Sequence, residues 1–230
     1  GVPEPPVGKV RKALSASSPF WGGKDTGYAS NRALMFQQLP TAGLPFQFEQ
    51  WSQLEGYVAD MMTTGVIDVF DEIRWDLRPS PKFGTLEVRI CDGIPTLSEL
   101  LSISALTHCL VEHFSSELDA GRELPSVPPW FAQENKWRSA RYGMDAILIL
   151  DKSADEELVT TDLTRLLERL TPVAERLGCT DELAGVESIM TNGASYQRQR
   201  AAAQRGGDLD SVAQLLVEEM RAGHPLLNVV

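Results

Sequence analysis

Cysteine is scarce in this chain, and long apolar runs are missing. Its 230 residues include three cysteines, Cys91, Cys109 and Cys179. An odd number of thiols spread this far apart along the sequence is typical of free cysteines in a reducing cytoplasm rather than of a disulfide framework, and their spacing matches no metal-binding pattern. No stretch approaches the roughly 18 consecutive apolar residues of a membrane-spanning helix, and no signal-peptide pattern is present. We therefore expect a soluble cytoplasmic protein with no membrane partner.

Basic residues are in the minority. The chain has 21 lysines and arginines against 32 aspartates and glutamates, which gives a formal net charge of −11. A surface that binds nucleic acid or anionic lipid without regard to sequence needs a basic patch, so this balance argues against both partners. The length fits one large domain or two small ones, and a chain of this size buries roughly 70% of its unfolded surface. A single hydrophobic core is therefore sufficient.

Two familiar site motifs are absent. The glycine-rich segment 22–27 contains Lys24, but it lacks the Walker spacing of glycines followed by Lys and Ser or Thr. His108 and His113 are five positions apart, which turns them about 140° away from each other on a helix. They cannot both face one metal ion, and they match no zinc-protease pattern. We predict a polar loop at 22–27 and histidines without a metal role.

The most informative stretch runs from Trp75 to Gly93. Apolar and polar residues alternate over 73–78 and again over 85–91, which predicts two short strands joined by a turn that contains prolines and a glycine. Because side chains alternate along a strand, Glu87 and Arg89 point the same way. Asp76 and Arg78 add a similar charge pair to the first strand. One interpretation is a solvated sheet face with a cross-strand salt bridge; the other is a ligand site.

Four segments carry a longer resemblance. They are Trp-Asp-Leu-Arg-Pro-Ser-x-x-Phe-Gly-Thr-Leu-Glu-Val-Arg-x-Cys-Asp at 75–92, Thr-Gly-Tyr-x-Ser-x-Arg at 26–32, Glu-Asn-Lys-Trp-Arg-x-Ala-Arg-Tyr-Gly-x-Asp-Ala at 134–146, and Asn-Gly-Ala-Ser-Tyr-Gln-Arg-Gln-Arg at 192–200. Together they resemble the ATP-dependent carboxylate-amine ligases of the glutamate-cysteine ligase type 2 family. The resemblance implies an α+β, glutamine-synthetase-like catalytic fold, in which an antiparallel sheet has helices packed on one face.

The resemblance also implies roles for individual residues. Glu87 is the expected Mg²⁺ ligand, because hard cations prefer oxygen donors. Arg89 and Arg78 are the expected catalytic residues, with Arg89 suited to a phosphate contact. Tyr28 and Arg32 are expected to bind the amino-acid substrate, since a planar guanidinium can donate two parallel hydrogen bonds to a carboxylate. The candidates for the nucleotide side are Asn135, Lys136 and Arg141.

The implied reaction joins a carboxylate to an amine at the expense of ATP, with glutamate as the acid and cysteine as the amine. A carboxylate is a poor electrophile, so it is first phosphorylated, which calls for a divalent metal and cationic side chains. ATP and Mg²⁺ are therefore the expected cofactors, small amino acids the expected partners, and the apolar helix surface is compatible with a homodimer. Two alternatives stay open: a phosphotransferase of the same fold, and a non-catalytic binding or oligomerisation module.

We treat residues 1–230 as a single catalytic domain. The resemblance implies that it is the C-terminal portion of a longer enzyme whose N-terminal metal-binding strands are not in this chain. At its beginning, the prolines at positions 3, 5 and 6 together with Gly8 predict irregular structure.

Periodicity predicts the remaining elements. Helical spacing predicts a helix over 48–65, and Thr96 with Glu99 forms a capping-box pattern that begins a helix to about Asp119. A helix of mixed character follows over 130–145, and a buried strand at 146–150 is expected to pair with 157–160. Further helices are predicted over 163–177, 181–190, 194–204 and 209–220. The charges of 192–200 predict a solvated helix face.

Overall fold

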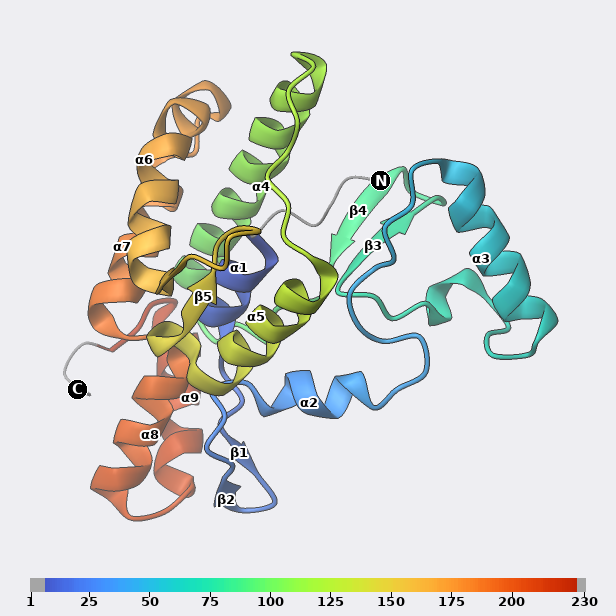
Figure 1. Cartoon of the computed structure of the whole chain (residues 1–230). Helices are drawn as coiled ribbons and strands as arrows, with labels where there is room; N and C mark the ends of the chain where they lie inside the picture. Colours follow the sequence, from blue (N-terminus) through green and yellow to red (C-terminus); the bar gives the residue numbers. More distant parts are fainter. Residues whose placement is uncertain (1–6, 227–230) are drawn as a thin grey trace.

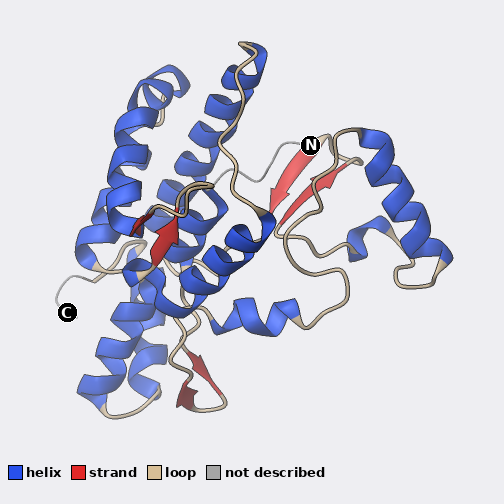
Figure 2. Cartoon of the chain, viewed as in Figure 1, coloured by secondary structure: helices blue, strands red, loops and turns tan. Residues whose placement is uncertain are grey.

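The computed structural model describes residues 7–226, most of which lie in helices (Figure 1, Figure 2). The α-helices of this range are α1 (Val7–Ser15), α2 (Asn31–Gln37), α3 (Trp51–Thr63), α4 (Leu97–Asp119), α5 (Pro129–Tyr142), α6 (Val159–Leu177), α7 (Thr180–Asn192), α8 (Ser195–Gly206) and α9 (Asp210–Ala222). Short 3₁₀ helices lie at Phe70–Glu72 and Gly143–Asp145. The predicted succession of helices is confirmed, with ends that differ by a few residues.

The strands form separate antiparallel hairpins rather than one sheet. They are β1 (Phe20–Trp21) with β2 (Lys24–Asp25), β3 (Leu77–Ser80) with β4 (Thr85–Val88), and β5 (Ile147–Ile149) with β6 (Glu156–Leu158). The predicted pairing of the strand near 146–150 with the one near 157–160 is confirmed. The α+β class is confirmed as well, but the described residues do not build a continuous sheet, because each hairpin pairs with no third strand among them.

The main core lies among α1, α4, α6 and α7 (Figure 1). Leucines at helical spacing on α6 give that helix one apolar face, and Leu163 and Leu170 on it are fully buried. They belong to the same buried cluster as Leu106 of α4. Helix α4 begins where the side chain of Thr96 accepts a hydrogen bond from the backbone N–H of Glu99. The N-cap half of the predicted capping box is therefore confirmed, whereas the Glu99 carboxylate accepts from the Thr96 hydroxyl and pairs with Arg198.

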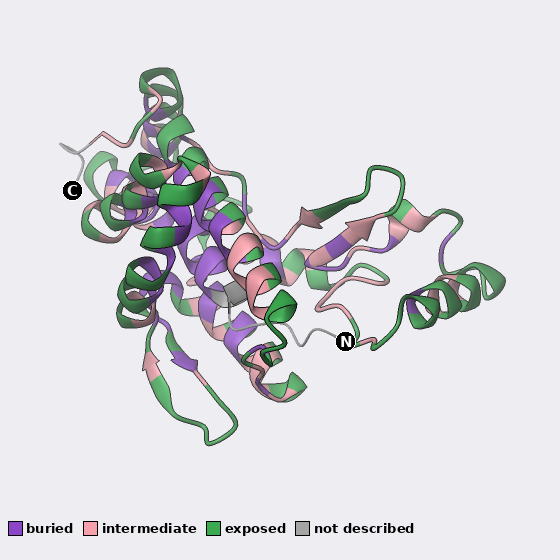
Figure 3. Ribbon diagram, turned by 90° about the horizontal axis from the view of Figure 1, so that it is seen from above, coloured by how far each residue is buried: buried purple, intermediate pink, exposed green. Residues whose placement is uncertain are grey.

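A smaller arm lies to one side of this body and consists of α3, the 3₁₀ turn at 70–72 and the β3–β4 hairpin (Figure 1, Figure 3). Its own apolar cluster contains Leu54, Ile67, Ile73 and Trp75. In Figure 3 the fully buried segments concentrate in the helical body, whereas the arm is largely exposed or half-buried. The arm holds the charged hairpin away from the main core.

Two sequence-based expectations need correction. Helix α1 begins at Val7 and includes Gly8, since a lone glycine lowers helix stability by only about 1 kcal/mol and packing against α5 can offset this. The prolines at 3, 5 and 6 lie outside the described residues. The segment 192–200 is not simply a solvated face: Arg198 is 1% exposed and lies between Glu99 and Glu219, at 2.9 and 2.7 Å. These partners are distant in sequence, so spacing could not indicate them.

The thiols of Cys109 and Cys179 lie 3.7 Å apart, although 70 positions separate them. Both are free, as is Cys91, in agreement with the sequence-based expectation. The contact arises because α4 packs along α7, which follows directly after Cys179. No helix among residues 7–226 combines the length and the apolar character needed to cross a bilayer.

Candidate functional site

The charged face of the β3–β4 hairpin is the centre of the site. The antiparallel register places Arg78 opposite Glu87, and a turn at Gly84, whose φ of +63° favours glycine, connects the strands. Arg78 Nη2 lies 2.5 Å from Glu87 Oε2, and Arg89 Nη1 lies 2.6 Å from Glu87 Oε1. Each carboxylate oxygen therefore meets one guanidinium, as the shared strand face predicted.

Backbone carbonyl groups of the segment that precedes β3 hold the Arg78 side chain in place. This side chain is only 8% exposed. It donates hydrogen bonds to the carbonyl oxygens of Ile73, at 3.1 Å, and Asp71. Partial burial would raise the pKa of Glu87, but the hydrogen bonds from Arg78 and Arg89 outweigh it and hold that pKa below its usual value. Glu87 is consequently an anion at neutral pH with a preset orientation.

Arg32 joins this group from α2. The hydroxyl of Ser30, the N-cap of α2, accepts from the backbone N–H of Ala33, which fixes the first turn of the helix. Arg32 Nη2 donates to the carbonyl of Arg89 at 3.2 Å, and both guanidiniums lie over the ring of Phe36, at 4.9 and 5.7 Å from its centroid. We call Arg32, Arg78, Arg89 and Glu87 the arginine cluster.

Tyr28 belongs to a second group, around Arg141. The Arg141 guanidinium lies 5.0 Å above the Tyr28 ring, and Trp137 meets that ring edge-on with centroids 6.4 Å apart. A Cβ at Gly27 would come within 2.7 Å of Arg141 Nη1, so glycine allows this close approach. Trp137 and Tyr142 are exposed, and Arg141 is half-buried. The result is an accessible patch of aromatic rings and one cation, which we call the Tyr28 patch.

Asn135 and Lys136 occupy the buried side of α5. The amide of Asn135 donates to the carbonyl of Ile149 at 2.9 Å and accepts from its backbone N–H at 2.8 Å, which fixes the edge of β5. Lys136 Nζ lies 2.5 Å from Asp76 Oδ2, with both side chains almost fully buried. The structure therefore brings Arg32, Arg78, Arg89 and Glu87 together and Tyr28 to Arg141, whereas Asn135 and Lys136 are engaged in internal contacts.

A third ion-pairing region connects α1 with the hairpin, and sequence reasoning missed it. Lys12 is 1% exposed, and its ammonium group interacts electrostatically with the carboxylates of Asp92 and Asp76. Burial lowers its pKa to about 8, although both carboxylates oppose the shift. The hydroxyls of Ser18 and Ser30 each donate to Asp92 at 2.7 Å. Asp76, Asp92 and Ser30 lie within resembling segments, but Lys12 lies outside all four of them and carried no signal of its own.

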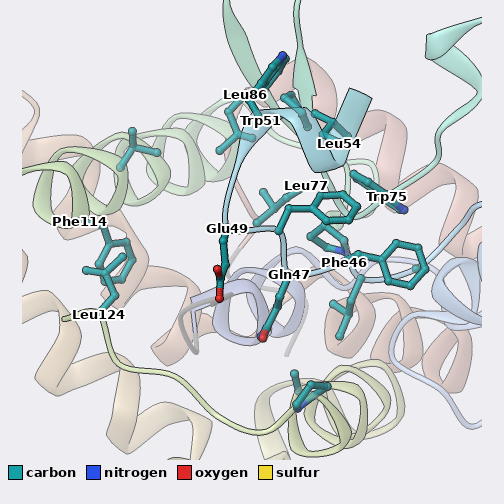
Figure 4. A pocket seen from close by; sticks show the side chains of 18 of the residues that line it. Phe46, Gln47, Glu49, Trp51, Leu54, Trp75, Leu77, Leu86, Phe114 and Leu124 are labelled. Atoms are coloured by element: carbon teal, nitrogen blue, oxygen red, sulfur yellow. The ribbon is translucent and has the colours of Figure 1, made fainter. Parts of the chain in front are cut away.

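The opposite face of the hairpin lines a groove of about 1230 Å³ (Figure 4). Leu77 and Leu86 point into it from the hairpin, since side chains alternate along a strand, and Phe46, Trp51 and Phe114 add further apolar surface. Glu49 and Gln47 enter from the same loop as Phe46. The hairpin thus separates the arginine cluster from an apolar groove, which the sequence patterns did not indicate.

The described residues contain no group of three or more His, Cys, Asp or Glu side chains arranged to hold a metal ion. Glu87 offers one carboxylate, and both of its oxygens contact guanidiniums. Mg²⁺ commonly uses one or two protein carboxylates together with water and phosphate oxygens. Glu87 therefore fits a partial metal site but not a complete one.

Comparison with known proteins now decides the family. The model of glutamate-cysteine ligase family 2 matches residues 7–215 of the chain. The chain belongs to this family. The match contains every residue of the arginine cluster and of the Tyr28 patch, so the family resemblance of the four segments is confirmed.

Relatives agree with this assignment. The chain is 64% identical over 213 residues to a protein of Arthrobacter sp. provisionally named glutamate-cysteine ligase 2-1, covering 92% of the chain and 56% of the relative. It is 63% identical over 213 residues to one of Nocardioides sp. provisionally named glutamate-cysteine ligase 2-3, covering 92% and 57%. With one of Mycobacterium tuberculosis provisionally named glutamate-cysteine ligase 2, the identity is 63% over 209 residues, or 90% and 56%. The chain spans little more than half the length of these relatives.

Proposed function

We propose that this chain contributes part of the active site of an ATP-dependent carboxylate-amine ligase of the glutamate-cysteine ligase type. Membership of the family supports the ligase class. The observation that carries the proposal is the arginine cluster, in which Arg78 and Arg89 pair with Glu87 and Arg32 lies beside Arg89 over the ring of Phe36. With Asp71 3.7 Å from Arg78, three guanidiniums gather near two carboxylates. Positive charge in this excess suits a site that must hold anionic substrates and a transferring phosphoryl group.

The proposed reaction proceeds through an acyl phosphate. An oxygen of the acid's carboxylate attacks the γ-phosphorus of ATP, and the bond to ADP breaks. The amine then attacks the carbonyl carbon, the bond to the phosphorylated oxygen breaks, and phosphate leaves while the amine loses a proton. Arg89 and Arg78 stabilise the negative charge that gathers on the transferring group. Arg32 binds a substrate carboxylate through paired hydrogen bonds.

The cofactors are ATP and Mg²⁺ in this proposal. Glu87 would hold Mg²⁺ with water and phosphate oxygens once one of its guanidinium contacts gives way, and the ion would supply charge neutralisation of the phosphates. Arg141, beside Tyr28 and Trp137, would meet the nucleotide, because a cation next to exposed rings suits both phosphate and a planar base. Asn135 and Lys136 would stabilise the nucleotide side of the site through their buried contacts with Ile149 and Asp76.

The fold proposed for the intact protein is glutamine-synthetase-like. The outer edges of β3 and β4 pair with no further strand among residues 7–226, so their backbone groups remain available to extend the sheet. A larger antiparallel sheet that includes this hairpin would place the arginine cluster on one of its faces. That arrangement agrees with the length of the relatives, which extends well beyond the matched part.

The test is Mg²⁺-dependent ADP release by the intact protein, with glutamate present and amines added one at a time, cysteine first. Stimulation by cysteine together with formation of γ-glutamylcysteine supports the proposal. Stimulation by another amine keeps the ligase chemistry but changes the substrate. ADP release that ignores every amine favours the phosphotransferase alternative, and no release under any condition favours a binding or oligomerisation module.

A further inference from the structure

The buried contact between Lys136 and Asp76 joins α5 to the base of the charged hairpin. Lys136 Nζ and Asp76 Oδ2 are 2.5 Å apart, and their side chains are 4% and 5% exposed. Lys136 shares its buried face of α5 with Ser139 and Ala140, and α5 packs along α1. With so little of its side chain exposed, Lys136 has almost no surface through which to contact a nucleotide.

Asp76 is connected through its backbone to the arginine cluster. Its N–H donates to the carbonyl of Gly43 at 2.8 Å, and its carbonyl accepts from the N–H of Arg89 at 2.8 Å. Arg78 follows two positions later on β3, opposite Glu87. A shift of Asp76 would therefore move Arg89 directly and Arg78 through the strand.

The same region contains a second buried lysine. Lys12 Nζ donates to the carbonyl of Ile90 at 3.5 Å and to the hydroxyl of Ser30 at 3.4 Å, and it interacts electrostatically with Asp76. Lysines from α1 and α5 thus face the carboxylates at positions 76 and 92 in the same buried region, where Arg32 adds a further positive charge. Removing one member leaves an uncompensated buried charge, which is strongly unfavourable.

We infer that Lys136 and Asp76 are positioning residues, which set the placement of Arg89 and Arg78 through a buried ion pair rather than touching a ligand. This inference rests on the proposed function. The inference predicts the same kinetic defect whether Lys136 or Asp76 is replaced. A direct nucleotide contact by Lys136 would instead give a defect of its own to the Lys136 variant. The inference differs from a purely structural role because the folded variants would remain catalytically defective.

Kinetics of the intact protein test the inference. Asp76→Asn and Lys136→Met should each lower kcat by about tenfold or more in the folded fraction, with KM for ATP changed by less than about twofold. The double variant should be no worse than the worse single variant, since both remove the same contact. Lys136→Arg should restore most of the activity. Arg138→Met is the matched control, because Arg138 lies on the same helix but pairs with Glu134 and Glu156 instead.

Two kinetic results would overturn the inference that Lys136 and Asp76 are positioning residues. A rise of KM for ATP in Lys136→Met that Asp76→Asn does not share would mean that Lys136 touches the nucleotide. Variants that lose folded protein but retain normal kcat and KM in the remainder would mean that the pair only stabilises the fold.

A second readout does not depend on activity and separates this inference from the proposed function. The ¹⁵N resonances of Arg78 and Arg89 Nε should shift in both single variants, while that of Arg198 Nε, bonded to Glu219 at 2.7 Å, should not. Unchanged Arg78 and Arg89 resonances would overturn the inference. Shifted resonances in a protein that releases no ADP with any acid or amine would keep the inference and reject the ligase.

Discussion

Arg78 and Glu87 face each other across the β3–β4 hairpin, with Nη2 of the arginine 2.5 Å from Oε2 of the glutamate. Nη1 of Arg89 lies 2.6 Å from the other carboxylate oxygen, Oε1. The carboxylate therefore orients two guanidiniums, and removing its charge would take the paired carboxylate from Arg89 and leave Arg78 with the more distant Asp71, 3.7 Å away.

Glu87→Gln should lower Mg²⁺-dependent turnover by about a hundredfold, because the amide neither balances the two arginines nor holds a cation as a carboxylate does. Steady-state kinetics of the intact protein would measure this. Glu156→Gln is the control, since Glu156 is on β6 and pairs with Arg138. Normal magnesium-dependent turnover in Glu87→Gln would reject the assigned role.

Arg198→Met should destabilise the protein by about 3–5 kcal/mol, since it leaves Glu99 and Glu219 as buried charges without their partner. Their side chains are 5% and 0% exposed. Denaturant unfolding would measure the loss. Arg165→Met should change the free energy of unfolding by less than about 1 kcal/mol, because its ion pairs with Glu157 and Asp162 are on the surface. Equal losses in the two variants would show that burial of the Arg198 pair is unimportant.

These residues also mark the limit of prediction from sequence. Alternation along two short strands placed Glu87 and Arg89 on one face, and leucine spacing located α6, because both patterns are local and periodic. Arg198, Lys136 and Lys12 form side-chain contacts with Glu99, Glu219, Asp76, Ser30 and Ile90, which lie 18 to 99 positions away. No local period records such contacts. Family resemblance singled out four segments, but it could not distinguish a residue on an accessible surface from one that faces the interior.

Lys12 should make stability depend on pH in a definite direction. Burial lowers its pKa from 10.5 to about 8, so between these values the unfolded chain keeps a proton that the folded chain has released. Folding therefore becomes more favourable as the pH rises from about 8 to 10.5, by at most about 3 kcal/mol.

The measurement is the difference in free energy of unfolding between the wild type and Lys12→Met across that pH range. Subtraction removes the opposing contributions of Tyr196 and Cys109, whose pKa values are raised by burial and do not depend on Lys12. The wild type should gain stability relative to the variant as the pH increases. A flat or falling difference would contradict the assigned environment of Lys12.

Cys109 should resist alkylation in the folded protein. Burial, followed by the adjacent thiol of Cys179, raises its pKa to about 12, and the thiolate is the reactive form. Iodoacetamide labelling at about pH 8, followed by mass spectrometry, should leave Cys109 unmodified until denaturant is added. Equal labelling of Cys109 before and after denaturation would show that the packing of α4 against α7 is looser than described.

Transfer of oxygen tests the central claim most directly. The intact protein is supplied with glutamate labelled with ¹⁸O in its side-chain carboxylate, ATP, Mg²⁺ and the amine that stimulates ADP release, and the released phosphate is analysed by mass spectrometry. Activation as an acyl phosphate predicts one ¹⁸O atom in phosphate for each amide formed. Amide formation with no ¹⁸O in the phosphate would contradict the account.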